Sequence, residues 1–159
     1  MRRLALLLLP VLAPGLAQAG SLFQPDPNAV QRYGPGYRYP QAGWIVLHVE
    51  GEPYERGYQH GTLLAPEIAA YVRCCAAVRG WKSPGEAWAQ TRTITNALFL
   101  RRFDKEYLEE MKGIADGATA AGARFNDRPI DLLDIAAINA WIDRLQTLLL
   151  KIIERPGRY

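Results

Sequence analysis

Apolar residues recur with helical spacing over most of the chain after Gly51. The first stripe opens at Pro53, which suits the first turn of a helix, and continues through Tyr58 and Leu64. Pro66 predicts that this helix restarts or kinks there, because proline cannot continue the hydrogen-bond ladder. Three further helices are predicted, each preceded by a capping residue: Ser83, Asp104 and Asp131.

Three shorter signals complete this pattern. Ser83-Pro84-Gly85-Glu86 has the spacing of a capping box with proline at the first helical position. The segment Asn126–Pro129 predicts a turn. An amphipathic pattern of leucines and isoleucines then runs from Leu145 to Ile153 and stops at Pro156.

Only one segment predicts a strand. Trp44–Val49 is a short apolar run bounded by Gly43 and Gly51, and its continuous apolar character predicts burial on both faces. Residues 20–42 are rich in proline, glycine and tyrosine, which predicts an extended arm that acts as a linker or a strap. Because one strand cannot form a sheet, we expect residues 43–159 to be the helix-rich N-terminal portion of a larger α+β domain.

The first 19 residues have the pattern of a secretory signal. Arg2 and Arg3 form a positive start, an apolar stretch follows, and Ala17-Gln18-Ala19 supplies small residues at a cleavage site. We expect cleavage after Ala19 and export to a periplasm or the medium, with an uncleaved anchor as the alternative. No later stretch is long and apolar enough to predict a transmembrane helix.

Composition narrows the classes of protein that fit. The 159 residues are 49% hydrophobic and 22% charged, which excludes a disordered tail, a collagen-like rod and a disulfide-dense miniprotein. The net charge of +3 includes two arginines of the leader, so the basic balance does not indicate a nucleic-acid partner. The chain contains two histidines, and neither the spacing of a zinc site nor any cofactor motif is present, so no metal or cofactor is expected.

The two cysteines are adjacent, at positions 74 and 75. Neighbouring residues do not easily close a disulfide, and on a helix they point about 100° apart. We therefore expect Cys74 and Cys75 to differ, with at most one facing the core and the other exposed. An intermolecular disulfide remains the alternative use of the exposed thiol.

Two glycine pairs stand out within the predicted helices. Gly57 and Gly61 are four residues apart and share one helix face, as do Gly113 and Gly117. Each glycine costs about 1 kcal/mol against alanine inside a helix, so a compensating close backbone approach is expected. The two pairs are predicted to pack on each other or on a sheet.

The segments that hold these glycines resemble a known family. Gly51–Gly61 is similar to the opening motif of the acyl-coenzyme A:6-aminopenicillanic-acid acyltransferase family, the C45 peptidase group. Glu109–Ala118 resembles the second signature of that family, and Asp131–Asn139 resembles its third element. The resemblance implies an N-terminal-nucleophile hydrolase with a four-layer αββα fold, which cuts its own backbone before a cysteine. It also implies substrates that are amides or thioesters, whose acyl group passes to water or an amine.

One departure from the family pattern affects the activity. The family nucleophile follows the third element, and this chain has no cysteine after Cys75. No catalytic residue is therefore assigned within the chain, which is expected to be inactive alone: a truncated, frameshifted, separately encoded or degenerate form. The rival predictions are a non-catalytic exported helical module that binds a partner through exposed apolar faces, and a complete small helical domain.

Six residues are candidates for lining or supporting a cleft: Glu55, Tyr58, Gln59, His60, Asp116 and Asn139. Tyr58 and Gln59 are candidates for an acyl pocket, and Glu55 suits helix capping at its third position. For His60 a hydrogen-bonded structural role is expected, with contact to a cleft as the alternative. Asp116 lies between two glycines, which makes it a candidate for a buried hydrogen-bonded role.

Overall fold

The computed structural model describes residues 26–140, so the predicted leader over residues 1–19 and the pattern from Leu145 to Ile153 lie outside the described residues. The described chain is a mixed α+β structure dominated by helices. Residues 132–140 form a further helical segment. The other elements follow in chain order: η2 Pro27–Ala29, β1 Gln31–Tyr33, β2 Gly36–Gln41, β3 Trp44–His48, α1 Pro53–Leu63, α2 Ala65–Arg79, α3 Pro84–Leu98, η3 Leu100–Arg102, α4 Lys105–Ala120, β4 Arg124–Phe125 and β5 Arg128–Pro129.

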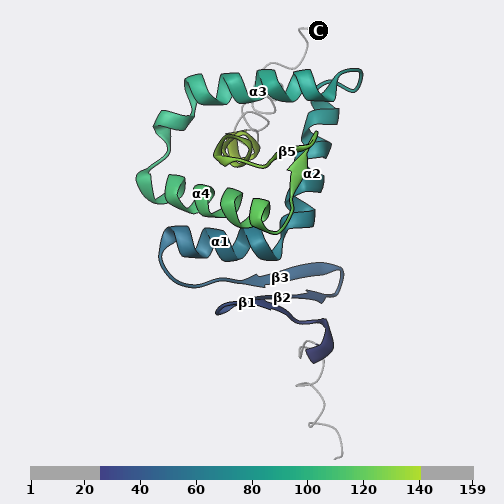
Figure 1. Ribbon diagram of the computed structural model, residues 1–159, viewed down its shortest axis with the longest axis vertical. Helices are drawn as coiled ribbons and strands as arrows, with labels where there is room; N and C mark the ends of the chain where they lie inside the picture. Colours follow the sequence, from purple (N-terminus) through teal and green to yellow (C-terminus); the bar gives the residue numbers. More distant parts are fainter. Residues whose placement is uncertain (1–25, 141–159) are drawn as a thin grey trace, which may run out of the picture.

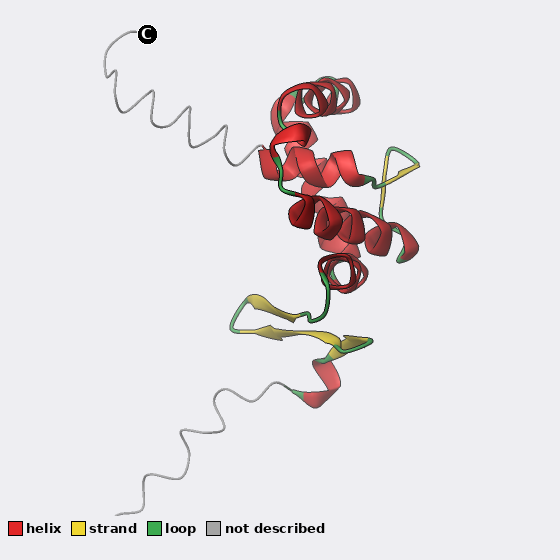
Figure 2. Ribbon diagram, turned by 90° about the vertical axis from the view of Figure 1, so that its left-hand side faces the viewer, coloured by secondary structure: helices red, strands yellow, loops and turns green. Residues whose placement is uncertain are grey.

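The elements are arranged in layers (Figure 1). The sheet β1–β3 lies at one end, α1 packs on it, and α4 packs on the opposite side of α1. Beyond α4 come the helical segment 132–140 and α3, with α2 running along the side of these layers. The turned view shows the same order, with the sheet joined to the helices through α1 (Figure 2). Helix α1 is therefore the element that links the sheet to the helical layers.

The predicted arm contains two strands of an antiparallel sheet with the order β1-β2-β3. The prediction of a single strand is therefore wrong. Strand β1 pairs with residues 36–38 of β2, so Pro40 lies beyond the three-stranded part, where β2 is an edge and proline is tolerated. The hairpin between β2 and β3 turns at Ala42 and Gly43, which have φ values of 49° and 83°, the left-handed geometry of a tight hairpin turn.

Burial of β3 also differs from the prediction. Trp44 is 78% exposed and Ile45 is 45% exposed, so the strand is not covered on both faces. Helix α1 covers one face of the sheet, where Gly36 contacts Gln59. No described element between residues 26 and 140 covers the opposite face (Figure 2).

The helices begin where the sequence predicts, although their caps differ in part. The Glu55 carboxylate accepts a hydrogen bond from the Glu52 backbone nitrogen at 3.1 Å, which confirms its capping role. Asp131 Oδ1 accepts from the backbone nitrogen of Leu133 at 2.9 Å, as predicted for a cap. Ser83 and Asp104 occupy the N-cap positions of α3 and α4, as predicted, but neither side chain makes a capping hydrogen bond, so the capping box predicted at Ser83 is not formed.

Helices α1 and α2 meet at a sharp bend beside Pro66. Between residues 26 and 140 no single helix is long and apolar enough to cross a membrane. Helices α1 and α2 reach the required length and apolar composition only when taken together, and they are bent by 83° relative to each other.

The hydrophobic core lies among α2, α3, α4 and the segment 132–140, with Val72 and Trp88 fully buried. Cys75 is buried in this core and Cys74 is exposed, which confirms that the adjacent thiols differ.

Candidate functional site

The two glycine pairs pack directly on each other. A methyl group at Gly57 or Gly61 would overlap the backbone carbonyl oxygens of Glu110 or Ile114 on α4. Methyl groups at Gly113 and Gly117 would in turn overlap the carbonyl oxygens of Tyr54 and Tyr58 on α1. Of the two predicted packing modes, the first is therefore confirmed: the two family-like segments form one tight helix–helix interface.

Polar bridges extend this interface between α1 and α4. One guanidinium nitrogen of Arg56 contacts Glu106 Oε1 at 3.0 Å and Glu110 Oε2 at 2.9 Å. The Tyr54 hydroxyl donates to Asp116 Oδ2 at 2.9 Å, and Lys112 pairs with the same oxygen. Although burial alone would raise the pKa of Asp116, the hydrogen bonds from Lys112 and Tyr54 lower it below its ordinary value. Asp116 is thus a half-buried, hydrogen-bonded carboxylate, which is close to the role for which the sequence made it a candidate.

A cleft with a volume of about 420 Å³ opens beside this interface. We call it the tyrosine cleft. The Tyr58 ring lies between two others, with its centroid 5.8 Å from that of Tyr33 and 6.2 Å from that of Tyr54. The cleft lies where the sheet, the β3–α1 connection and the first turns of α1 meet, and three candidates from the sequence line it. Its lining residues are Tyr33, Pro35, Glu50, Gly51, Tyr54, Glu55, Tyr58 and Gln59.

Gln59 fixes one wall of the tyrosine cleft. Its side-chain amide donates to the Glu50 carbonyl oxygen at 2.7 Å and accepts from the Glu50 backbone nitrogen at 3.1 Å. The residue is only 6% exposed, and Gly36 leaves no room for a side chain beside it. Gln59 therefore ties the β3–α1 connection to α1, so its main role is to hold the cleft in shape.

Three candidates do not line the tyrosine cleft. Asp116 lies behind Tyr54 and holds its hydroxyl. The Asn139 amide donates to the Ile135 carbonyl oxygen one turn earlier, at 2.9 Å, and to Met111 Sδ at 3.6 Å. Burial lowers the pKa of His60, and its imidazole makes no hydrogen bond within residues 26–140, so the hydrogen-bonded role predicted for it is not confirmed.

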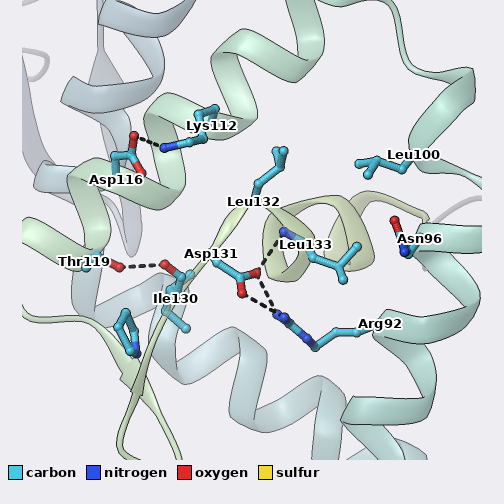
Figure 3. Close-up of a pocket in the computed structure, with 11 residues that line it drawn as sticks. Arg92, Asn96, Leu100, Lys112, Asp116, Thr119, Ile130, Asp131, Leu132 and Leu133 are labelled. Carbon is cyan, nitrogen blue, oxygen red and sulfur yellow. Dashed lines mark hydrogen bonds and ion pairs between the residues drawn. The ribbon is translucent and has the colours of Figure 1, made fainter.

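A second cavity, of about 470 Å³, lies among α3, α4 and the start of the segment 132–140 (Figure 3). Its charged side chains are already paired: Arg92 contacts both carboxylate oxygens of Asp131 at 2.7 and 2.8 Å, and Lys112 pairs with Asp116. Thr119 donates to the Ile130 carbonyl oxygen at 2.6 Å. These pairs hold the surrounding elements together and present no unpaired charge to a ligand.

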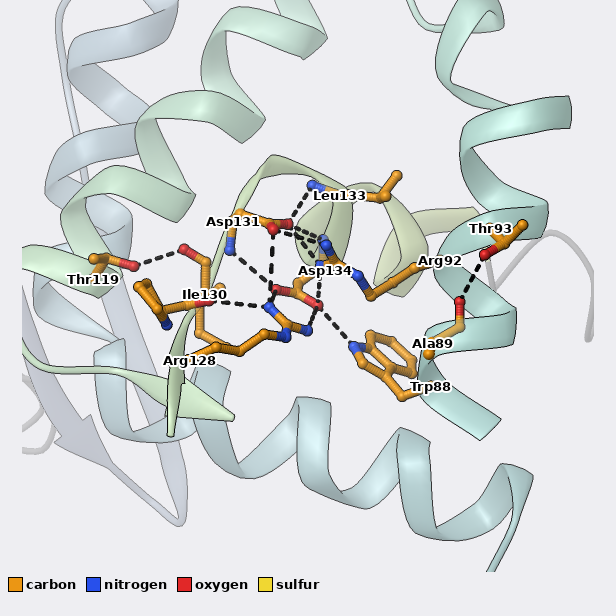
Figure 4. A network of polar contacts seen from close by, with 11 residues as sticks. Trp88, Ala89, Arg92, Thr93, Thr119, Arg128, Ile130, Asp131, Leu133 and Asp134 are labelled. Carbon is orange, nitrogen blue, oxygen red and sulfur yellow. Dashed lines mark hydrogen bonds and ion pairs between the residues drawn. The ribbon is translucent and has the colours of Figure 1, made fainter. Parts of the chain in front are cut away.

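The sequence analysis missed the most highly connected polar residue, Asp134 (Figure 4). Its side chain is fully buried. It accepts hydrogen bonds from the Trp88 indole at 2.7 Å and from two nitrogens of Arg128 at 2.6 and 2.7 Å, while Arg92 lies 2.6 Å away. Against the cost of burial, these contacts lower the pKa of Asp134 to about 2. No local signal marks it, since Trp88 is 46 residues away in sequence.

Comparisons with known proteins give one relative and no family. No family model matches the chain, and no solved structure matches it. An uncharacterized protein of Archaeoglobus fulgidus is 30% identical over an alignment of 106 residues that covers 64% of this chain and 17% of the relative. The chain thus matches a small part of a much longer protein. Within residues 26–140, no group of three His, Cys, Asp or Glu side chains is placed to hold a metal ion.

Proposed function

We propose that this chain is the pre-nucleophile portion of an exported, C45-like acyltransferase or amidohydrolase with an N-terminal-nucleophile fold. The main support for this proposal is the direct packing of two glycine motifs, Gly57/Gly61 on α1 and Gly113/Gly117 on α4. The two segments that resemble the family signatures are about fifty residues apart and are in direct backbone contact. That contact gives a physical reason for the spacing of both motifs, which is why it supports the proposal.

Neither cysteine of the chain suits the nucleophile of this proposal. Cys74 and Cys75 both lie inside α2, where no free α-amino group can accept a thiol proton. Burial also raises the pKa of Cys75, which opposes formation of its thiolate. The proposed function therefore requires a cysteine in further polypeptide, and the much greater length of the Archaeoglobus relative supports such a longer form.

The proposed reaction uses ordinary thiol chemistry. A freed α-amino group has a pKa of about 7.7–8.0, and a free thiol has a pKa of about 8.5. Because the two pKa values are close, moving the thiol proton to the amine costs little free energy. The thiolate attacks the acyl carbonyl and displaces the amine or thiol of the substrate, which leaves with that proton. Water or a second amine then takes the acyl group from the sulfur. In this scheme the tyrosine cleft is the proposed pocket for one substrate group.

Reading and expressing the coding sequence beyond the Tyr159 codon tests the proposal. We expect one of its frames to encode a cysteine that begins a strand-rich segment. The extended product should be cut immediately before that cysteine, as intact-mass measurement would reveal, and replacement of the cysteine by alanine should abolish the cut. The absence of such a segment in every frame would refute the proposal, as would acyl transfer by the 159-residue chain that survives replacement of both Cys74 and Cys75 by alanine.

A second candidate function, a non-catalytic partner-binding module, rests on exposed apolar side chains. Trp44 on the sheet, Val78 on α2 and Trp81 after it are all exposed. Exposed large apolar groups favour association. Light scattering separates the candidates: the purified chain should associate or aggregate if it is an orphaned half, whereas a monomer with one cooperative melting transition would favour a self-contained domain.

A further inference from the structure

The tyrosine cleft combines aromatic rings with carboxylates and contains no basic side chain. Three tyrosines and two glutamates, Glu50 and Glu55, are among the eight residues that define it. Its volume of about 420 Å³ falls within the range of small-molecule sites, about 300–1,000 Å³. A cleft of this composition attracts positive charge, because carboxylates and the faces of aromatic rings are both electronegative.

The tyrosine rings adjoin one another and leave part of their surface accessible, since Tyr33 and Tyr54 are each 41% exposed. The planes of Tyr33 and Tyr58 are tilted by 34°, and those of Tyr54 and Tyr58 by 42°. Ring centroids at 5.8 and 6.2 Å keep all three rings within reach of one ligand, and a cation is attracted within about 6 Å of a ring centroid. One small cation can therefore contact more than one ring.

The walls are also fixed before a ligand binds. Tyr54 is held by its hydrogen bond to Asp116, and Gln59 is locked to both backbone polar groups of Glu50. Glu55 is oriented by the Glu52 backbone nitrogen. Because these side chains are already ordered, binding would cost little further conformational entropy.

The nearest cationic groups leave much of the negative charge of the cleft in place. Arg56 is engaged by Glu106, Glu110 and the Gly51 carbonyl oxygen, and it forms no ion pair with Glu55. His48 Nε2 lies 3.1 Å from Glu50 Oε1, whereas Glu55 forms no ion pair within residues 26–140.

We propose that the tyrosine cleft binds an organic ammonium ion with alkyl substituents, whose charge lies against Tyr33 and Tyr58 and is balanced by Glu55. Such a cation matches the site because its alkyl groups suit an apolar aromatic wall while its charge suits the carboxylate. This inference concerns the same cleft that the proposed function assigns to a substrate group, but it is argued from the lining of the cleft alone and needs no nucleophile. Its failure and the failure of the proposed function are therefore separate results.

Isothermal titration with choline tests the inference. The reference ligand is the uncharged carbon analogue of choline, in which a quaternary carbon replaces the nitrogen. We expect choline to bind at one saturable site about tenfold more tightly than the analogue, because the analogue lacks the positive charge that the aromatic rings and Glu55 attract. Equal binding of the two ligands, or no saturable binding of choline, would overturn the inference.

Variants locate the binding to the cleft. Tyr33→Leu keeps an apolar side chain but removes the ring, and Glu55→Gln keeps a capping side chain but removes the charge. Each should weaken choline binding about tenfold, with the circular dichroism spectrum unchanged. Tyr107→Leu, at an exposed tyrosine of α4 outside the cleft, is the matched control and should bind normally. Unaltered choline affinity in both cleft variants, or a loss in Tyr107→Leu of the same size, would contradict this location.

Discussion

Replacing Gly61 by alanine is expected to force helices α1 and α4 apart. The added methyl group would overlap the Ile114 carbonyl oxygen and lie 2.7 Å from the Ala118 backbone nitrogen. Favourable contacts between heavy atoms lie at about 3.5–4.0 Å. Both obstacles are backbone atoms of a helix, so no side-chain rotation can relieve the overlap, and one helix must move as a body by about 1 Å.

The expected cost follows from two opposing contributions. Overpacking a close interface costs about 1–3 kcal/mol and sometimes more, while alanine gains about 1 kcal/mol over glycine from helix propensity. Because the obstacles here are rigid, we take the upper part of the first range and expect a net loss of about 2 kcal/mol. For a domain of this size, the midpoint of thermal unfolding should fall by roughly 5–10 °C.

Urea and thermal unfolding followed by circular dichroism measure this loss. Gly85→Ala is the matched control, because its methyl group meets only the end of the flexible Asn126 side chain near the start of α3. The control should be neutral or slightly stabilising. A second variant, Gly117→Ala, should lose a similar amount, and the double variant should lose less than the sum, since one helix displacement relieves both overlaps. An unchanged or raised stability of Gly61→Ala would refute the close approach of α1 and α4.

Three further outcomes are expected. Asp134→Asn removes a buried charge that two arginines contact and should destabilise the fold by about 3 kcal/mol in urea unfolding at pH 7. Because the pKa of Asp134 is lowered from 3.8 to about 2, its contribution is complete above about pH 5 and is lost as the pH falls through 2. A loss of equal size at pH 2 and pH 7 would contradict that assignment. A thiol reagent should modify Cys74 in the folded chain and Cys75 only after unfolding, since burial covers Cys75 and raises its pKa, whereas equal rates would contradict the core position. Burial lowers the pKa of His60, so a proton NMR titration should give a pKa below 6.5 for this side chain. The stability that comes from burying the neutral imidazole should be complete above pH 6.5 and decline as the pH falls. A measured pKa above 6.5 would show that the His60 side chain is not desolvated.

Part of the candidate site could be predicted from the sequence because its signals are local. Glu55 was placed at its capping position by spacing from the start of the helix, and the hydrogen bond to Glu52 confirms it. Tyr58 and Gln59 were selected as cleft residues within the same motif, and both line the tyrosine cleft. Tyr33 was not selected, because it reaches the cleft only through a sheet that the sequence pattern did not predict.

The missed sheet shows how local rules fail when pairing decides the structure. Prolines at positions 35 and 40 favour an irregular arm when each is considered alone. In the folded chain Pro35 occupies a tight turn and Pro40 an edge, so neither interrupts the paired segment. The strand at Trp44 lies where the sequence predicts it, but its exposure depends on which layers cover it, and α1 packs mainly on β1 and β2.

The sequence by itself determined the starts of the helices, the break near Pro66, the difference between the adjacent thiols and the need for a close approach at the glycine pairs. These features depend on periodicity, capping and backbone freedom, which act within a few residues. Only the tertiary structure shows that α4 packs on α1, that Asp134 contacts two arginines and a tryptophan, and that three tyrosines line one cleft. Each of these depends on which faces of distant segments come together, and that is set by burial of the whole chain.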